Sequence, residues 1–197
     1  MRLQRRWVGV ATTLALAAAC AASAQASATP AFDELLQLLA ARRHGHVTFT
    51  EVQQLAMLDR PLKSSGELLY DAPDRLEKRT LKPKARTLVL EHGVLTARRG
   101  QRSYLMELRE YPQVAPFVES IRATLAGDRA ALERLFRVQF DGTLAHWTLL
   151  LVPLDTTLAG AVTDIRIEGE RDVIRTVQIR HSDGDRSLLT LGPEIPP

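Results

Sequence analysis

The stretch that decides the fold is TLVLEHGVLTAR, residues 87–98. Two short runs of strand-forming residues, 87–91 and 94–98, flank the pair His92-Gly93. A two-residue connection with glycine in second place is typical of a tight hairpin between antiparallel strands. The sequence around residue 90 therefore predicts an antiparallel sheet.

The segments on either side extend this sheet. Val47 and Phe49 alternate with Thr48 and Thr50, which is the period of a half-buried strand. Residues 57–65 are expected to form a loop, because they contain Pro61 and two serines. Further strands are predicted at about 66–70, 75–81 and 103–109. Short strands joined by turns indicate an antiparallel meander.

A helical interval interrupts the strands. Apolar residues recur at helical spacing from Val114 to Leu125, Gly127 ends that helix, and Asp128 is placed to cap the next one. Strands then resume at 137–140, 144–152, 162–167, 173–180 and 187–191. The turns expected between them lie at Asp141-Gly142, Glu168-Gly169 and Asp183-Gly184.

Another amphipathic helix precedes the sheet, at about 31–42, with Thr29 as its cap and Pro30 in its first turn. A sheet of this many strands twists and curls, and helices must bury their apolar stripes against it. We expect an α+β fold: an incomplete antiparallel β-barrel, a curled sheet of about 9–11 strands, with helices plugging or lidding a hydrophobic cavity.

The first residues have the order of a secretory signal peptide. Arg2, Arg5 and Arg6 precede an uncharged run over 7–19, and small residues follow it. We assign 1–28 to this signal and 29–197 to one domain, with cleavage after Ala24, Ala26 or Ala28. Cys20 allows a second interpretation, in which the chain is cut before this cysteine and acylated there.

Charge and motif content exclude several function classes. The chain has 26 basic and 23 acidic residues, and removal of the three signal arginines leaves 23 of each, so nothing indicates nucleic-acid binding. Catalytic and phosphate-binding motifs are absent from the sequence. His44-Gly45-His46 is the one close histidine pair, and we interpret it as turn residues. We expect no catalytic residues, no metal and no cofactor.

Two clusters of basic residues lie near the central hairpin. They are Lys78, Arg79, Lys82, Lys84 and Arg86, and then Arg98, Arg99 and Arg102. One interpretation is a solvated sheet face. The other is an electrostatic patch that docks a protein partner or anionic lipid headgroups.

The chain resembles the LolA-type outer-membrane lipoprotein carriers over about 32–98. The residues that carry the resemblance are Phe49-Thr50-Glu51, then GELLYDAPDRL at 66–76, and His92-Gly93-Val94-Leu95. The resemblance implies an unclosed barrel around a hydrophobic cavity with helices as its lid. It also implies a periplasmic carrier that takes lipoproteins from an inner-membrane transporter and delivers them to an outer-membrane acceptor, as a monomer without a cofactor.

Apolar residues of the predicted strands and of the central helix are the candidates for binding acyl chains in such a cavity. The candidates in the strands are Phe49, Leu68, Tyr70, Leu76, Leu88, Leu90, Tyr104, Trp147 and Leu149, and those in the lid are Phe117 and Ile121.

The family's motif is altered at two places. Its arginine before the proline, which latches the lid, falls on Ala72 here, and its aromatic residue falls on Leu76. Arg75 lies nearby but is expected to point differently. The cargo could therefore be a free lipid, glycolipid or pigment instead of a lipoprotein. A third possibility is a lipoprotein acceptor anchored in the outer membrane through Cys20, and a fourth is an enzyme whose site residues come from distant segments.

Overall fold

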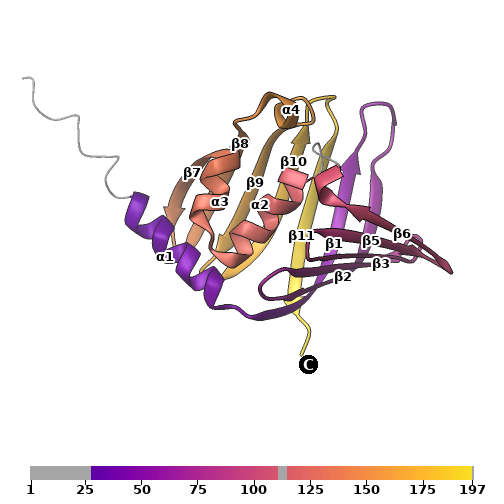
Figure 1. Ribbon diagram of the computed structural model, residues 1–197, viewed down its shortest axis with the longest axis horizontal. Coiled ribbons are helices and arrows are strands. Elements are labelled where there is room, and N and C mark those ends of the chain that lie inside the picture. The colour runs from indigo at the N-terminus through magenta and orange to yellow at the C-terminus, as the bar shows by residue number, and fades with distance from the viewer. Residues whose placement is uncertain (1–27, 111–114, 197) are drawn as a thin grey trace, which may run out of the picture.

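The computed structural model describes residues 28–110 and 115–196, and these form one antiparallel sheet with helices on one side (Figure 1). The elements in chain order are α1 (Ala28–Ala41), β1 (His44–Gln54), β2 (Leu62–Asp71), β3 (Arg75–Lys82), β4 (Arg86–Glu91), β5 (Val94–Arg99), β6 (Arg102–Glu107), the 3-10 helix η1 (Leu108–Glu110), α2 (Ala115–Ala126), α3 (Arg129–Leu135), β7 (Phe136–Thr143), β8 (His146–Pro153), α4 (Thr156–Ala159), β9 (Val162–Glu170), β10 (Val173–His181) and β11 (Arg186–Glu194). Residues 1–27, and with them Cys20 and most of the predicted signal, lie outside the described part.

The sheet is open. Its eleven described strands follow the order β6-β5-β4-β3-β2-β1-β11-β10-β9-β8-β7, so β6 and β7 are its two edges and β1 pairs with β11 at the centre. In Figure 1, β7–β11 run upright while β2–β6 swing round to lie across the view. The expected incomplete barrel is thereby confirmed: the sheet curls strongly but does not close.

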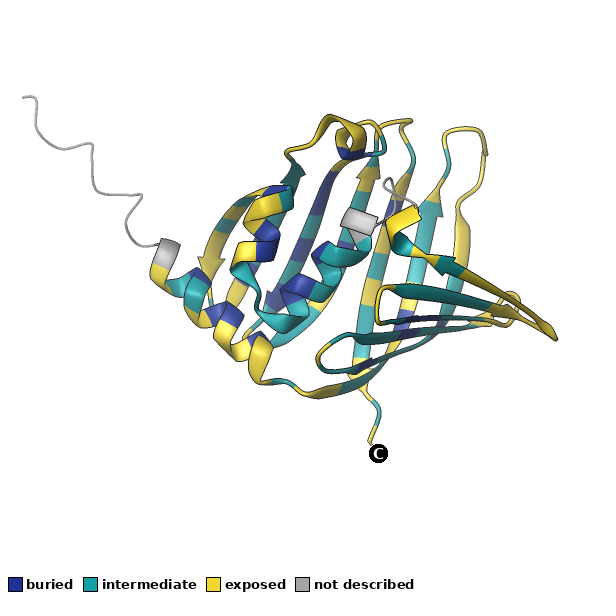
Figure 2. Ribbon diagram, in the orientation of Figure 1, coloured by how far each residue is buried: buried dark blue, intermediate teal, exposed yellow. Residues whose placement is uncertain are grey.

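Helices α1, α2 and α3 cover only one half of this sheet. In Figure 1 they lie in front of β7–β10, and α1 and α3 both contact β7. Phe32 of α1 meets Phe140 of β7 with ring centroids 5.7 Å apart. Leu149, Leu151 and Ile165 have no exposed surface beneath the helices. Figure 2 shows the buried segments gathered here, so the packed core belongs to the C-terminal half.

Local sequence signals place several boundaries correctly. His92 and Gly93 both have positive φ, 51° and 73°, which is the backbone of the predicted hairpin turn. Gly127 ends α2 with φ 65°, and the carboxylate of Asp128 accepts a hydrogen bond of 2.9 Å from the Ala131 N–H at the start of α3.

Two predicted turns are wrong. Residues Asp141-Gly142 lie inside β7 and Glu168-Gly169 inside β9, and the chain turns instead at 144–145 and 171–172. Both positions require glycine because a neighbouring strand lies very close. A Cβ on Gly169 would collide with the Trp147 ring, and one on Gly142 would collide with the His146 carbonyl oxygen. The strands therefore continue through residues that sequence patterns associate with reversals.

Two further boundaries differ from expectation. β2 begins at Leu62, so the predicted loop is shorter, because Leu62–Ser65 pair with the far end of β1. At the other end of the meander, β6 stops at Glu107 and Arg109 lies in η1.

Candidate functional site

The strand register places the predicted wall residues on one face of the sheet. Residues that pair directly across antiparallel strands point to the same side. Phe49 opposes Gly66 and Leu191, and the pairing continues from there to both edges of the sheet. All nine strand candidates fall on the face that carries the helices; they are Phe49, Leu68, Tyr70, Leu76, Leu88, Leu90, Tyr104, Trp147 and Leu149.

These nine residues divide between two environments. Trp147 and Leu149 lie in the half covered by helices and belong to the packed core. The Trp147 indole donates a hydrogen bond of 2.9 Å to the Arg171 carbonyl oxygen. The other seven lie on β1–β6, which no described helix covers in the same way (Figure 2).

We call the apolar side chains of β1–β6 on this side the open face. Four further positions belong to it that were not among the candidates: Val47, Ala97, Leu95 and Met106. The open face consists of Val47, Phe49, Leu68, Tyr70, Leu76, Leu88, Leu90, Leu95, Ala97, Tyr104 and Met106. The alternation in 94–99 and 102–107 is the signal that could have found the last two.

Exposure differs among the side chains of the open face and is high at the edge of the sheet. Phe49 and Leu90 are buried, whereas Leu68, Leu76 and Leu88 are only half-buried. Tyr104 on the edge strand β6 is 57% exposed. A run of partly solvated aliphatic side chains on a curled sheet is a surface that can take an apolar ligand.

The helix α2 borders the open face. Burial raises the pKa of Tyr70, while the positive charges of Arg43 and of Arg122 on α2 act in the opposite direction. Ile121 on α2 is half-buried, and the side chain of Phe117 lies outside the described residues.

One ion pair lies within the open face and is internally neutralised. The Lys78 ammonium lies 4.9 Å from the centre of the Phe49 ring and donates a 2.9 Å hydrogen bond to Glu51. Burial raises the pKa of Glu51, but the hydrogen bond and charge of Lys78, with hydrogen bonds from Ser64 and Ser187, outweigh it and hold this pKa below its ordinary value. Glu51 is therefore a satisfied anion.

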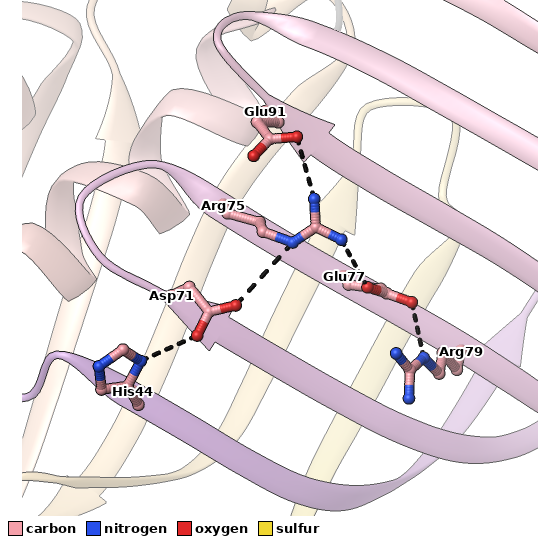
Figure 3. Close-up of polar contacts among 6 residues, drawn as sticks. All are labelled: His44, Asp71, Arg75, Glu77, Arg79 and Glu91. Carbon is pink, nitrogen blue, oxygen red and sulfur yellow. Dashed lines mark hydrogen bonds and ion pairs between the residues drawn. The ribbon is translucent and has the colours of Figure 1, made fainter.

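Several ion pairs lie on the opposite side of the same strands (Figure 3). Arg75 donates to Glu91 at 2.9 Å and to Glu77 at 3.0 Å, and Arg79 donates to Glu77 at 2.6 Å. Arg75 points away from the helices, as expected, and so cannot replace the arginine missing at Ala72.

The histidine pair lies in β1 on this outer side, so the interpretation of His44 and His46 as turn residues is wrong. His44 Nδ1 is 2.9 Å from Asp71, and His46 Nε2 is 3.2 Å from Glu67. Each histidine thus has a carboxylate of its own. Within the described residues, no group of histidine, cysteine and acidic side chains could hold a metal ion.

Two cavities open on the sheet. One of about 340 Å³ lies between the ends of β8 and β9 and has His146, Glu168 and Arg175 among its lining residues. The other, of about 420 Å³, lies at the far end of the open face, where Glu51, Thr80, Arg86 and Arg99 meet.

None of the described helices is both long enough and apolar enough to cross a membrane.

The sequence matches the model of a known protein family. A family model described as "Outer membrane lipoprotein carrier protein LolA-like" matches residues 13–193. No curated protein matches the sequence.

Solved structures give only distant matches. A LolA superfamily protein of Nitrosomonas europaea superposes with a TM-score of 0.48 at 9% identity, over 85% of this chain and 92% of that one. A domain assigned to outer-membrane lipoprotein sorting in Vibrio parahaemolyticus gives 0.47 at 10% identity, over 86% and 93%. A chain of the MucA/MucB complex of Pseudomonas aeruginosa gives 0.45 at 16% identity, over 85% of this chain and 59% of that one.

Proposed function

This chain belongs to the LolA-like outer membrane lipoprotein carrier family, and on that premise we propose that it is a periplasmic carrier of acylated cargo. It shields acyl chains of lipoproteins on the open face and moves them from the inner to the outer membrane. No catalytic step is part of this function. An inner-membrane transporter and an outer-membrane acceptor are its proposed partners.

The observation that supports this proposal most strongly is the uncovered, half-buried aliphatic surface of β2–β4. Leu68, Leu76 and Leu88 lie on the side that the helices cover elsewhere, yet remain partly solvated. Burying one methylene of an acyl chain contributes about 0.8 kcal/mol. A chain laid along the open face would therefore gain affinity from each strand it crosses.

Intact mass of the protein purified from its native periplasmic and membrane fractions tests the proposal. We expect a periplasmic species that begins near residues 25–29 and carries an acylated protein. A membrane-bound species beginning at an acylated Cys20 would contradict it in favour of an anchored acceptor. Bound lipid, glycolipid or pigment without any lipoprotein would replace the proposed cargo.

A matched pair of variants tests the binding surface. Leu88→Asp places a charge on the open face, whereas Leu105→Asp places one on the opposite side, where Leu105 is 73% exposed. We expect Leu88→Asp to lose binding of a fluorescent fatty-acyl probe and Leu105→Asp to retain it, with thermal melts confirming that both fold. Equal binding by both would exclude the open face as the site.

A further inference from the structure

The basic residues near the central hairpins separate into two groups in the structure. Lys78 pairs with Glu51, and Arg79 pairs with Glu77. By contrast, Arg86, Arg99 and Lys84 form no ion pair anywhere in the described part of the chain. Positive charges left without partners are the ones available to an anionic ligand.

The unpaired cations converge on the larger cavity. It has a volume of about 420 Å³, and Lys63, Lys84, Arg86 and Arg99 all line it. We call these four residues and Thr80 the basic pocket. The one acidic residue in its lining is Glu51, whose charge is already balanced by Lys78 at 2.9 Å. The basic pocket therefore carries a net positive charge inside a concave site.

The basic pocket continues directly from the open face. Arg86 stands two residues from Leu88 on β4, and Arg99 stands two residues from Ala97 on β5, all on the same side of the sheet. Two residues along a strand span about 7 Å. An acyl chain on the open face would thus place its polar end among these arginines.

We propose that the cargo includes an anionic headgroup, a phosphate or carboxylate, that binds Arg86 and Arg99 while its acyl chain lies on the open face. This inference rests on the proposed carrier function and specifies the chemical class of the ligand. Guanidinium groups suit it, because their planar donors match the oxygens of phosphate and carboxylate. Lys84 and Lys63 add charge at the rim, and the Thr80 hydroxyl offers a neutral donor.

Two amphiphiles with chains of equal length test the proposal, the anionic dodecyl phosphate and the neutral monolauroylglycerol. Calorimetry on the delipidated protein should give about tenfold tighter binding of dodecyl phosphate, because hydrogen bonds between charged groups are stronger than those between neutral ones. Arg99→Gln and Arg86→Gln should each remove most of that preference and leave monolauroylglycerol binding unchanged.

The matched control is Arg98→Gln. Arg98 precedes Arg99 on β5, is exposed, and points to the opposite side of the sheet, so the variant loses the same charge outside the basic pocket. It should keep the full preference, and Arg99→Lys should keep part of it. An equal loss in Arg98→Gln and Arg99→Gln would overturn the proposal.

The other possible results distinguish the headgroup site from the carrier function. Equal affinity of the unaltered chain for both amphiphiles would overturn the headgroup site and leave the carrier function standing. Failure of both amphiphiles to bind would contradict the carrier function itself. If inorganic phosphate alone bound as tightly as dodecyl phosphate, the basic pocket would be a site for free anions, and the lipid assignment would be wrong.

Discussion

The two halves of the sheet are built on the same alternation but reach different degrees of burial. On β7–β10, the inner side chains are closed off by α1–α3, and Leu149 and Ile165 are fully buried. On β2–β6, Tyr70 and Leu90 are buried, but the other described side chains of the open face stay half-buried or exposed. The difference indicates that the C-terminal half contains most of the packed core, while the N-terminal half leaves many apolar side chains partly solvated.

The largest expected effect is a difference between the two halves in how much a leucine-to-alanine substitution lowers the free energy of unfolding. Leu149→Ala should lower the free energy of unfolding by about 3 kcal/mol, because it leaves a cavity in close-packed surroundings. Leu88→Ala, on the open face, should cost about 1 kcal/mol or less, since part of that side chain is already solvated. Urea denaturation of both variants without ligand measures the contrast. Equal losses would mean that the open face is packed like the core.

A second test concerns the space made for Trp147. Gly169→Ala should destabilise the protein by about 1–3 kcal/mol, because the added methyl collides with the indole ring. Gly45→Ala is the control, since its methyl would meet Tyr70 at an ordinary 3.9 Å. Trp147 is the only tryptophan after residue 28, so its fluorescence reports the repacking. An unchanged spectrum and midpoint for Gly169→Ala would refute this role.

A smaller effect is expected at the helical cover. Asp128→Ala removes the acceptor for the Ala131 N–H at the start of α3 and should cost about 1 kcal/mol. Because α3 contacts β7, the loss should appear as faster hydrogen exchange in α3 and β7 and not in β3–β5. Protection lost uniformly over the sheet would show that the two halves do not open separately.

The smallest effect concerns the outer side of the N-terminal half. Hydrogen bonds from Arg79, followed by those from Arg75, outweigh burial and hold the pKa of Glu77 below its ordinary value of 4.5. The ionised carboxylate therefore stabilises the fold above that value, and this contribution is lost as the pH falls through the lowered pKa. Glu77→Gln should cost less than about 1 kcal/mol at neutral pH.

The pH dependence provides the check on Glu77. Denaturant midpoints of Glu77→Gln and of the unaltered chain should differ at pH 7 and converge at strongly acidic pH. Glu107→Gln, at an exposed position on β6, is a comparison in which the pH profile should change little. A difference for Glu77→Gln that persisted unchanged into acid would assign its effect to packing instead of charge.

Much of the fold follows from local patterns in the sequence. The alternation around Phe49 and Leu88 and the His92-Gly93 turn are enough to place the strands, whereas the face that lines a cavity follows only from the strand register. The family's motif residues then identify the class of fold. Local patterns do not show contacts between residues on different strands. Gly142 and Gly169 were predicted to lie in turns, but they are needed inside strands because His146 and Trp147 of the neighbouring strand leave no space for a side chain.

The candidate site shows the same limit. Seven of the candidates chosen from the sequence lie together on the open face, but the sequence did not separate them from Trp147 and Leu149, which belong to the packed core. Which half the helices cover depends on how α1 packs against α2 and β7, and no periodicity encodes that choice. Likewise, the paired and unpaired arginines of the basic clusters are indistinguishable until the strands are assembled.

The pairing of β1 with β11 has a consequence for how the molecule folds. Ser187 on β11 reaches Glu51 on β1 across 136 positions of the chain, so the centre of the sheet joins its earliest and latest strands. Closing so large a loop carries a high entropic cost and slows the approach to the native state. As the chain is synthesised, the hairpins of β2–β6 can form early. β1 can pair with β2 at that stage, but it cannot pair with β11 until the last strand has been made. Until then the nascent protein exposes the unpaired edge of β1, and at this stage it is most prone to aggregate.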